Sequence, residues 1–323
     1  MNLFFTSLTM NNSPQKLIDL HQDVVSHLRG EMPTQTNLTA LAKTTELFFG
    51  SVFIEPENNL SIQEGVQRVT NDIAWYQSLG NPFRVIRNEK DLDYAKTGET
   101  GVVIHLEGAD FLTPETASAL AKWYNGGLRS IGFLWNKDNA LGTSAASKKP
   151  DQGLTLFGKQ VLKEANNLGI MIDCAHVNER GFYDILEYSK TPPFITHGNA
   201  YTLCPNPRNF TDNQIKVLAA RGGIIGVFFS SKYVQMDRQP NVDDVIDHIA
   251  YIADLVGAES IAIGSDFGGI TSGLIPGLEK LTDMIEFEER LRVRGFTDEN
   301  IGKIFSDNAL QFVKNFFTNE SKK

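Results

Sequence analysis

Short apolar segments alternate with amphipathic segments along almost the whole chain, and this rhythm constrains the fold more than any other feature. Eight runs rich in Val, Ile and Phe are apolar throughout, as is typical of strands buried on both faces of a parallel sheet. The predicted strands span residues 17–20, 48–54, 102–106, 129–134, 170–174, 194–196, 223–229 and 260–264.

Amphipathic segments with helix start and stop signals separate most of these runs. Thr113 is a predicted N-cap with Pro114 at the first helical position, and Gly169 is expected to end a later helix. The predicted helices span residues 62–78, 114–124, 156–168, 212–221, 242–255 and 278–294.

Eight strands alternating with helices predict an α/β fold, a (β/α)8 TIM barrel. We expect this barrel to form a single catalytic domain over residues 1–323, with a frayed polar tail near residues 318–323. A doubly wound open sheet has the same rhythm and stays open as an alternative, although no GxGxxG motif or P-loop opens the first strand–helix turn.

Composition limits the compartment and the partners. The 323 residues carry a net charge of −9, which argues against binding to nucleic acid or to an anionic membrane. The two cysteines, Cys174 and Cys204, exclude a disulfide framework and are typical of a reducing compartment. No run approaches the roughly 18 apolar residues of a membrane span, and the start of the chain lacks the features of a signal peptide. We therefore expect a cytoplasmic protein.

Ionisable residues follow five of the predicted strands at the point where each strand ends. In a barrel these ends meet at one rim, where catalytic groups gather. The rim receives His21, Asp23, Glu107, His176, His197 and Asp266. A lone histidine at a strand end is more often structural, and a lone carboxylate can cap a helix or start a turn. Three histidines and three carboxylates together, however, would repel one another or be desolvated at high cost unless a cation compensates them.

Imidazole and carboxylate ligands suit Zn2+, with Mn2+, Co2+ and Fe2+ as alternatives. Five ligands exceed what one tetrahedral catalytic site uses, so we predict two metals with Glu107 as the bridge. His21 and Asp23 would hold one metal, and His176 and His197 the other. Two metals about 3.5–4 Å apart can share a hydroxide at neutral pH and polarise a carbonyl, and these are the functions that a hydrolase needs.

Asp266 is the carboxylate without a metal to hold in this scheme. It could accept the proton of the attacking water and pass it to a leaving amine. The chain has no Gly-x-Ser-x-Gly elbow and no cysteine with a base nearby in sequence, so nucleophilic catalysis is disfavoured. Of the other histidines, we predict that His105 packs in the barrel, that His27 is a solvated or capping residue and that His248 lies at the surface of a helix.

The same residues stand in an ordered set of motifs that resembles the membrane (renal) dipeptidase family of binuclear zinc metallopeptidases. The motifs are Ile-Asp-Leu-His-Gln-Asp at 18–23, His-Leu-Glu-Gly at 105–108, Leu-Thr-Leu-Phe-Gly at 154–158, Ile-Asp-Cys-Ala-His-Val at 172–177, Thr-His-Gly-Asn-Ala-Tyr at 196–201, Pro-Arg-Asn at 207–209, Gly-Ser-Asp-Phe-Gly-Gly at 264–269 and Gly-Phe-Thr-Asp-Glu-Asn-Ile at 295–301. Their order and spacing are far more specific than any single motif.

The resemblance implies an amidohydrolase-like barrel with two zinc ions that hydrolyses dipeptides with free amino and carboxyl ends, and it implies a homodimer. By position it implies the same five metal ligands. It assigns Asp266 to handling the proton and holding the substrate amine, and Arg208 to gripping the substrate carboxylate, which suits a bidentate guanidinium. Tyr233 falls where the family has a second carboxylate contact.

Trp135 is a departure from the family pattern. Better-known members have a histidine after the fourth strand, whereas this chain has Phe-Leu-Trp-Asn at 133–136. An indole N–H can donate a hydrogen bond but cannot become positively charged. Two alternatives therefore stay open beside a dipeptidase. One is a binuclear metal hydrolase of another amide or ester, such as a β-lactam, a lactone or an N-acyl amino acid. The other is a barrel that binds peptides without turnover.

Overall fold

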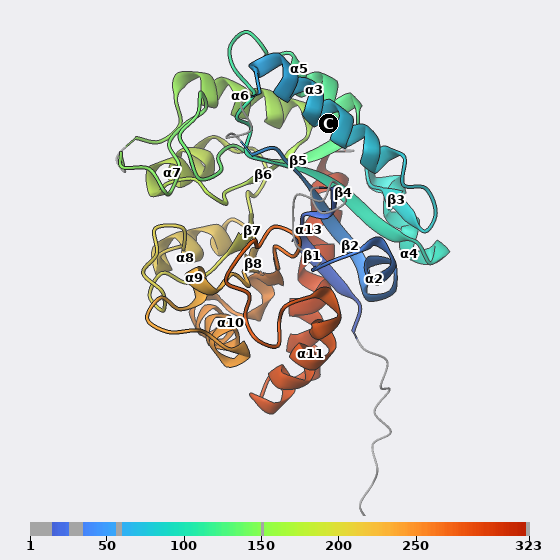
Figure 1. The fold of residues 1–323 in the computed structure, drawn as a ribbon, viewed down its shortest axis with the longest axis vertical. Helices are drawn as coiled ribbons and strands as arrows, with labels where there is room; N and C mark the ends of the chain where they lie inside the picture. The colour runs from blue at the N-terminus through green and yellow to red at the C-terminus, as the bar shows by residue number, and fades with distance from the viewer. Residues whose placement is uncertain (1–14, 26–34, 56–59, 150–151, 321–323) are drawn as a thin grey trace, which may run out of the picture.

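A barrel of parallel strands forms the centre of the computed structural model, which describes residues 15–25, 35–55, 60–149 and 152–320 (Figure 1). The strands are β1 (Leu17–Gln22), β2 (Thr45–Phe53), β3 (Phe83–Val85), β4 (Thr100–Glu107), β5 (Leu128–Gly132), β6 (Met171–Asp173), β7 (Ile195–Gly198), β8 (Ile225–Val227) and β9 (Ile261–Ile263). All but β3 correspond to predicted strands. β3 pairs with β4 beside the barrel, and its three residues are too few to form a recognisable apolar run.

The order of the strands confirms the barrel. The sheet runs β6-β5-β4-β2-β1-β9-β8-β7, and the described strand pairs are parallel. The two end strands meet through a single bridge between Asp173 and Phe194. There the Cys174 N–H donates to the Phe194 carbonyl at 2.8 Å, and the Phe194 N–H donates to the Ile172 carbonyl at 3.1 Å. We call this junction the β6–β7 seam. Because it joins the ends of the sheet, the open-sheet alternative is wrong.

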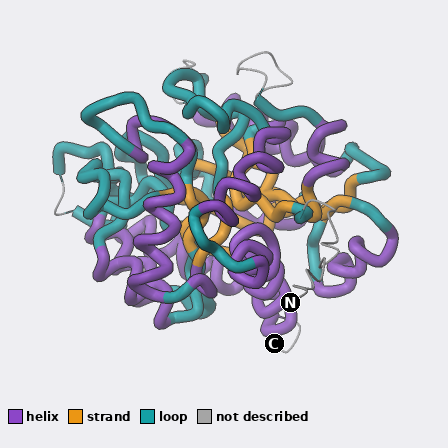
Figure 2. Tube along the Cα trace, turned by 90° about the horizontal axis from the view of Figure 1, so that it is seen from below, coloured by secondary structure: helices purple, strands orange, loops and turns teal. Residues whose placement is uncertain are grey.

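Helices surround the strands (Figure 2). The α-helices are α2 (Leu38–Thr44), α3 (Ile62–Gln77), α4 (Tyr94–Thr97), α5 (Ala119–Asn125), α6 (Leu156–Leu168), α7 (Glu179–Tyr188), α8 (Asp212–Ala220), α9 (Ser231–Val234), α10 (Val242–Val256), α11 (Met284–Val293), α12 (Asp298–Gly302) and α13 (Asn308–Glu320). Single short turns of other helix types are η1 (Glu89–Asp93), η2 (Ala258–Ser260), η3 (Leu281–Asp283) and η4 (Lys303–Asp307).

The predicted helix boundaries are confirmed for α6 and wrong for α5. Thr155 caps α6 with its side chain, and Gly169 ends that helix with a left-handed φ of 75°. The predicted start of α5 at Pro114 is five residues early, because the Thr116 hydroxyl donates to the Phe111 carbonyl at 2.7 Å and holds this segment in turns. The predicted frayed tail is helical through Glu320, and residues 321–323 lie outside the described residues.

Helix α13 covers the amino ends of the strands. The ring of Phe312 lies 5.2 Å from the ring of Phe194, which directly precedes β7. Phe316 and Phe317 belong to the same buried cluster as Ile18 of β1. Since this end is filled by apolar side chains, the opposite end, where the strands finish, is left for a functional site. Within the described part of the chain, no helix has the length and apolarity needed to cross a membrane.

Candidate functional site

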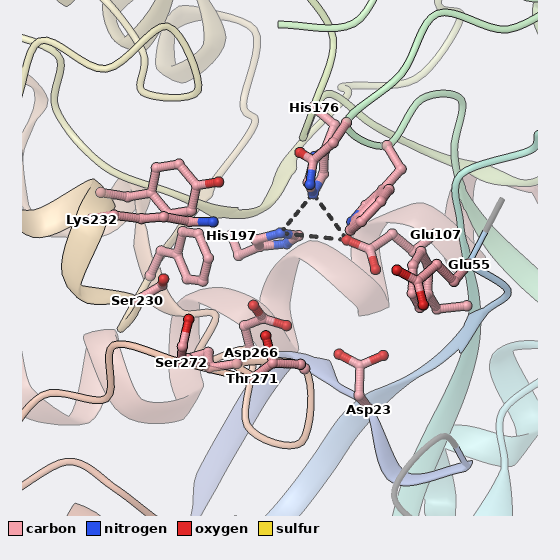
Figure 3. A pocket seen from close by; sticks show the side chains of 17 residues that line it. Asp23, Glu55, Glu107, His176, His197, Ser230, Lys232, Asp266, Thr271 and Ser272 are labelled. Carbon is pink, nitrogen blue, oxygen red and sulfur yellow. Dashed lines mark hydrogen bonds and ion pairs between the residues drawn. The ribbon is translucent and has the colours of Figure 1, made fainter. Parts of the chain in front are cut away.

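A pocket of about 460 Å³ opens at the carboxyl ends of the strands (Figure 3). Its wall is formed by the last residues of β2, β4 and β7 and by the segments after β1, β2, β5, β6, β8 and β9. Its charged and imidazole-bearing lining residues are Asp23, Glu55, Glu107, His176, His197, Lys232 and Asp266.

Glu107, the last residue of β4, presents its two carboxylate oxygens to two different groups. Its Oε1 atom lies 3.0 Å from His176 Nε2 and 3.5 Å from His197 Nε2, and these two nitrogens are 3.1 Å apart (Figure 3). Its Oε2 atom lies 3.6 Å from His21 Nε2. Glu107 therefore stands between two sets of ligand atoms.

The second set gathers around His21 of β1. Its Nε2 atom lies 3.4 Å from Asp23 Oδ2 and 3.8 Å from Asp266 Oδ1. The structure thus brings together all six residues that the sequence places at the rim.

The site residues fit two divalent cations. Both ring nitrogens of His21 and both carboxylate oxygens of Asp23 are buried without a hydrogen-bond partner among the described residues. Such atoms carry a desolvation cost that a cation would offset. Burial, assisted by the charge of Arg208, lowers the pKa of His176 to about 4, so its imidazole is neutral at physiological pH. Neutral imidazole with carboxylate is a donor set typical of Zn2+ and related metals.

Backbone strain concentrates at this site. Among the described residues, the non-glycine residues with a left-handed backbone are His176, with φ of 64°, and Asp266, with φ of 62°. The His176 carbonyl accepts from Ala145 N–H at 2.8 Å, and the Asp266 N–H donates to the His21 carbonyl at 3.2 Å. Strained conformations of this kind persist where the surroundings enforce them, and they cluster at functional sites.

Hydrogen bonds also fix the orientation of two histidines. His176 Nδ1 lies 3.2 Å from Asn136 Oδ1, and His197 Nδ1 lies 2.9 Å from Thr196 Oγ1. The Thr196 hydroxyl donates to Asp173 at 2.7 Å, so it accepts from His197. Because Nδ1 carries the proton in both rings, the Nε2 lone pair of each faces Glu107.

Asp19 is a buried residue that holds the backbone next to His21 and Asp266 in place, and it is not among the site residues predicted from the sequence. It is fully buried and accepts hydrogen bonds from the Ser265 hydroxyl at 2.6 Å, the Gln22 amide at 2.6 Å and the His21 N–H at 3.1 Å. These bonds tie β1 to the segment that carries Asp266. A signal was present, because Asp19 precedes His21 and Asp23 at the period of two that places strand residues on one face.

The side chains of Asp266 and Asp23 lie close together at the end of β1. Burial, followed by the nearby charge of Asp23, raises the pKa of Asp266 well above its ordinary value. Gly269 makes room for both groups, since a Cβ atom there would lie 2.3 Å from Asp266 Oδ1 and 2.4 Å from Asp23 Oδ2. Packing against these two carboxylates therefore requires glycine at position 269, the second of the two glycines in the motif.

Arg208 and Tyr233 lie on the β7–β8 side of the site. Arg208 is buried, and its Nη2 donates to the His197 carbonyl at 3.2 Å while Nε and Nη1 have no partner among the described residues. It lines a neighbouring cavity of about 370 Å³ rather than the main pocket. Tyr233 lines the main pocket and stacks on Phe228 with ring centroids 5.0 Å apart.

Trp135 forms part of the pocket wall. Its ring centroid lies 4.9 Å from that of Phe53 and 6.3 Å from that of His176. The Ser144 hydroxyl donates to its carbonyl at 2.7 Å and holds the backbone in place. The indole therefore stands beside the ligand cluster, where the resemblance leads us to expect a histidine.

The remaining histidines have structural partners where they are described. His105 is buried as predicted, with Nδ1 2.9 Å from Ser130 Oγ. The prediction that His248 lies at the surface is wrong. This side chain is buried, accepts from Ala200 N–H at 3.2 Å through Nδ1, and donates to the Val234 carbonyl at 3.0 Å through Nε2. It connects the segments after β7 and β8. His27 lies outside the described residues.

Comparisons with known proteins identify the family of this chain. The family model described as membrane dipeptidase (Peptidase family M19) matches residues 9–323. A protein described as uncharacterized, from the pqqA 5′ region of Klebsiella pneumoniae, is 34% identical over 76% of this chain and 96% of its own length. A Schizosaccharomyces pombe protein described as an uncharacterized dipeptidase is 31% identical over 77% of this chain and 59% of its own length.

Solved structures share the fold. A metallopeptidase of Rhodobacter sphaeroides, solved with a phosphinate mimic of the dipeptide L-Ala-D-Ala, has a TM-score of 0.83 at 22% identity, over 94% of this chain and 99% of its own. A probable dipeptidase of Pseudomonas aeruginosa has a TM-score of 0.83 at 17% identity, and the match covers 94% of this chain and 96% of the other. The match of the family model over nearly the whole chain shows that this protein belongs to the membrane dipeptidase family and is a hydrolase that acts on dipeptides.

Proposed function

We propose that the enzyme cleaves dipeptides with free amino and carboxyl ends by means of two divalent cations. His21 and Asp23 hold one cation, His176 and His197 hold the other, and Glu107 bridges them. The observation that carries the proposal is the placement of Glu107, whose two oxygens face the two sets of ligand atoms. Zn2+ suits these ligands best, and Mn2+, Co2+ and Fe2+ accept the same ones.

Two cations at this centre would activate a water molecule and polarise the scissile carbonyl. The chain supplies the proton transfer. Asp266 takes a proton from the attacking water and delivers it to the leaving amine, a role supported by its place at the edge of the ligand cluster, with Oδ1 3.8 Å from His21 Nε2. The same carboxylate holds the free amino end of the substrate before attack.

We assign the substrate carboxylate to Arg208 and Tyr233. Two buried donors of the Arg208 guanidinium have no partner among the described residues, which supports a role in binding an anionic group. Tyr233 lines the pocket on the same side. The dipeptide therefore lies with its amino end toward Asp266 and its carboxyl end toward the segments after β7 and β8.

Trp135 favours a second candidate, the hydrolysis of another amide or ester by the same centre. It lies 6.3 Å from His176, between ring centroids, and cannot supply the charge of a histidine. A different carbonyl compound, such as a β-lactam, a lactone or an N-acyl amino acid, is therefore the comparison to make.

We further propose a cytoplasmic homodimer built from one catalytic domain per chain. Both cysteines are free and buried, which supports a reducing compartment. The described strands and helices from Leu17 to Glu320 follow one barrel, which supports a single domain. Cell fractionation and light scattering test the location and the dimer.

A substrate panel with metal analysis tests the proposed function. Purified protein is assayed on L,L and L,D dipeptides, tripeptides, a β-lactam, a lactone and an N-acyl amino acid, with bound metal counted in the same samples. We expect two metals per chain, cleavage of dipeptides and little action on tripeptides. Cleavage of the lactone or β-lactam but of no dipeptide would favour the second candidate.

A further inference from the structure

One corner of the pocket combines an ammonium group with two hydroxyl groups. Lys232 and Ser230 come from the segment after β8, and Ser272 comes from the segment after β9. Figure 3 shows the Lys232 ammonium group on the side of the pocket opposite Asp23, with Ser230 and Ser272 on its own side. We call these three residues the Lys232 corner.

Hydrogen bonds between neighbouring segments build this corner. The Ser231 N–H donates to the Gly273 carbonyl at 2.9 Å, which places the residues on either side of Ser231 next to Ser272. The Lys232 carbonyl accepts from Asn206 Nδ2 at 3.4 Å and from Cys204 Sγ at 3.7 Å. Three barrel loops thus hold the backbone of the corner in one position.

The groups at this corner have unused binding capacity. Among the residues that the structure describes, Lys232 has no ion pair, and its Nζ atom lies 4.9 Å from the ring centroid of Tyr233. The Ser230 side chain makes no capping hydrogen bond at the start of α9, and both Ser230 and Ser272 line the pocket. The other charged side chains of the pocket wall, imidazoles aside, are the carboxylates Asp23, Glu55, Glu107 and Asp266. Apart from the proposed metal ions, the Lys232 corner is therefore the part of this wall that attracts an anionic group.

We propose that the Lys232 corner binds the acidic side chain of the second residue of the dipeptide, so that the enzyme prefers substrates that end in Asp or Glu. This inference rests on the proposed function, in which Arg208 and Tyr233 take the carboxyl end. Because Lys232 adjoins Tyr233, the side chain of the same substrate residue is directed toward the ammonium group. A carboxylate there gains an ion pair and hydroxyl donors, whereas a neutral side chain gains neither.

Kinetics on matched dipeptides test the corner. The kcat/KM values for Ala-Ala, Ala-Asp and Ala-Glu, with either stereoisomer at the second residue, are measured for the metal-loaded wild type, Lys232→Gln and Lys232→Glu. Lys314→Gln, an exposed lysine on α13 at the other end of the barrel, is the matched control. We expect Lys232→Gln to lower the acidic-to-neutral ratio roughly three- to five-fold, since Lys232 is solvent-exposed. Lys232→Glu lowers the ratio further, and added salt shrinks the wild-type preference.

Two results would overturn the proposal, and both leave the acidic-to-neutral ratio unchanged. If kcat/KM falls by the same factor for acidic and neutral dipeptides, Lys232 contacts the terminal carboxylate common to all substrates. If neither kcat/KM value changes, the corner binds no part of the substrate.

Binding without turnover separates this inference from the proposed function. Phosphinate mimics of Ala-Ala and Ala-Asp are titrated into the metal-loaded wild type and Lys232→Gln by calorimetry. Lys232-dependent tighter binding of the Ala-Asp mimic, with no dipeptide cleaved, would retain the corner and overturn the proposed function. Equal affinities for the two mimics, together with normal dipeptide cleavage, would overturn the role of the corner and retain the proposed function.

Discussion

The Nε2 atoms of His176 and His197 lie 3.1 Å apart, although the two residues follow different strands. Two nitrogens that ligate one tetrahedral zinc at about 2.0–2.1 Å are separated by roughly 3.3 Å. The two imidazoles are therefore already placed as neighbouring ligands of one cation. The Oε1 atom of Glu107, at 3.0 and 3.5 Å from these nitrogens, stands where a third ligand belongs.

Glu107→Gln is expected to remove the pairing of the metals. The amide keeps the size of the side chain, but it lacks the charge and the second anionic oxygen. We expect fewer than two metals per chain by elemental analysis, and activity reduced by more than about 100-fold, since even outer-shell changes cost 10–100-fold. Glu164→Gln, the same change at an exposed position of α6, should have no effect. Two metals and full activity in Glu107→Gln would refute the bridge.

Asp266→Asn is expected to separate catalysis from metal binding. The variant keeps the five proposed ligands, so it should retain two metals per chain. It cannot transfer the proton, so kcat should fall by roughly 10²–10⁴-fold. If metal content falls together with activity, Asp266 is a ligand rather than a proton carrier.

Gly269→Ala tests the packing between the two carboxylates. The new Cβ would lie 2.4 Å from Asp23 Oδ2 and 2.3 Å from Asp266 Oδ1, so both carboxylates must shift away from it. Displacement of a reacting group by about 1 Å can cost 100-fold in rate, and we expect a loss of this order. Circular dichroism should show an intact fold. Wild-type kinetics in this variant would show that the carboxylates tolerate the shift.

Paired substitutions at Trp135 distinguish a wall from a hydrogen-bond donor. Trp135→Phe keeps an aromatic ring against Phe53 but removes the N–H, so we expect kcat to change little. Trp135→Ala opens the wall, and KM should rise by roughly ten-fold. A large loss of kcat in Trp135→Phe alone would instead assign the indole N–H to the reaction.

His248 should make stability fall in mild acid. Burial lowers its pKa below the ordinary value of 6.5, so the folded state resists protonation there while the unfolded state accepts it. Its contribution is therefore complete above pH 6.5 and is lost as the pH falls toward the lowered pKa, by at most about 1.4 kcal/mol per pH unit for one proton.

Urea unfolding between pH 5 and 8 measures this effect. His248→Gln should be less stable than wild type at pH 8, because two buried backbone groups lose their partner, and the difference should narrow toward pH 5. If the difference in unfolding free energy stays constant across this pH range, the pKa of His248 is the same in the folded and unfolded states, and the prediction is wrong.

The sequence predicts the rim well because strand ends are local features. An apolar run followed by His21 or His176 identifies both the strand and the side of the barrel on which it ends. The surroundings of these residues depend on packing between distant segments. The bond from Ala200 to His248 joins residues 48 positions apart, and the bond from Ser265 to Asp19 joins residues 246 positions apart. No periodicity reveals such contacts.

Short elements escape prediction for a related reason. β3 is a strand only because β4 pairs with it, and its three residues have no signal of their own. Thr113 and Pro114 carry the local signature of a helix start, yet the Thr116 hydroxyl competes successfully for the backbone. In both places tertiary partners outweigh local preference.

The β6–β7 seam implies a structural role for the proposed metal ion, beside its role in hydrolysis. The barrel closes there through one bridge, and the segments on its two sides carry His176 and His197, the two histidines of one proposed cation site. An ion held by both residues would link the two strands across the joint that closes the barrel. Amide hydrogens of Cys174 and Phe194 should then exchange with deuterium slowly in the loaded enzyme and quickly after chelation, which would make metal supply a determinant of how long the barrel stays closed.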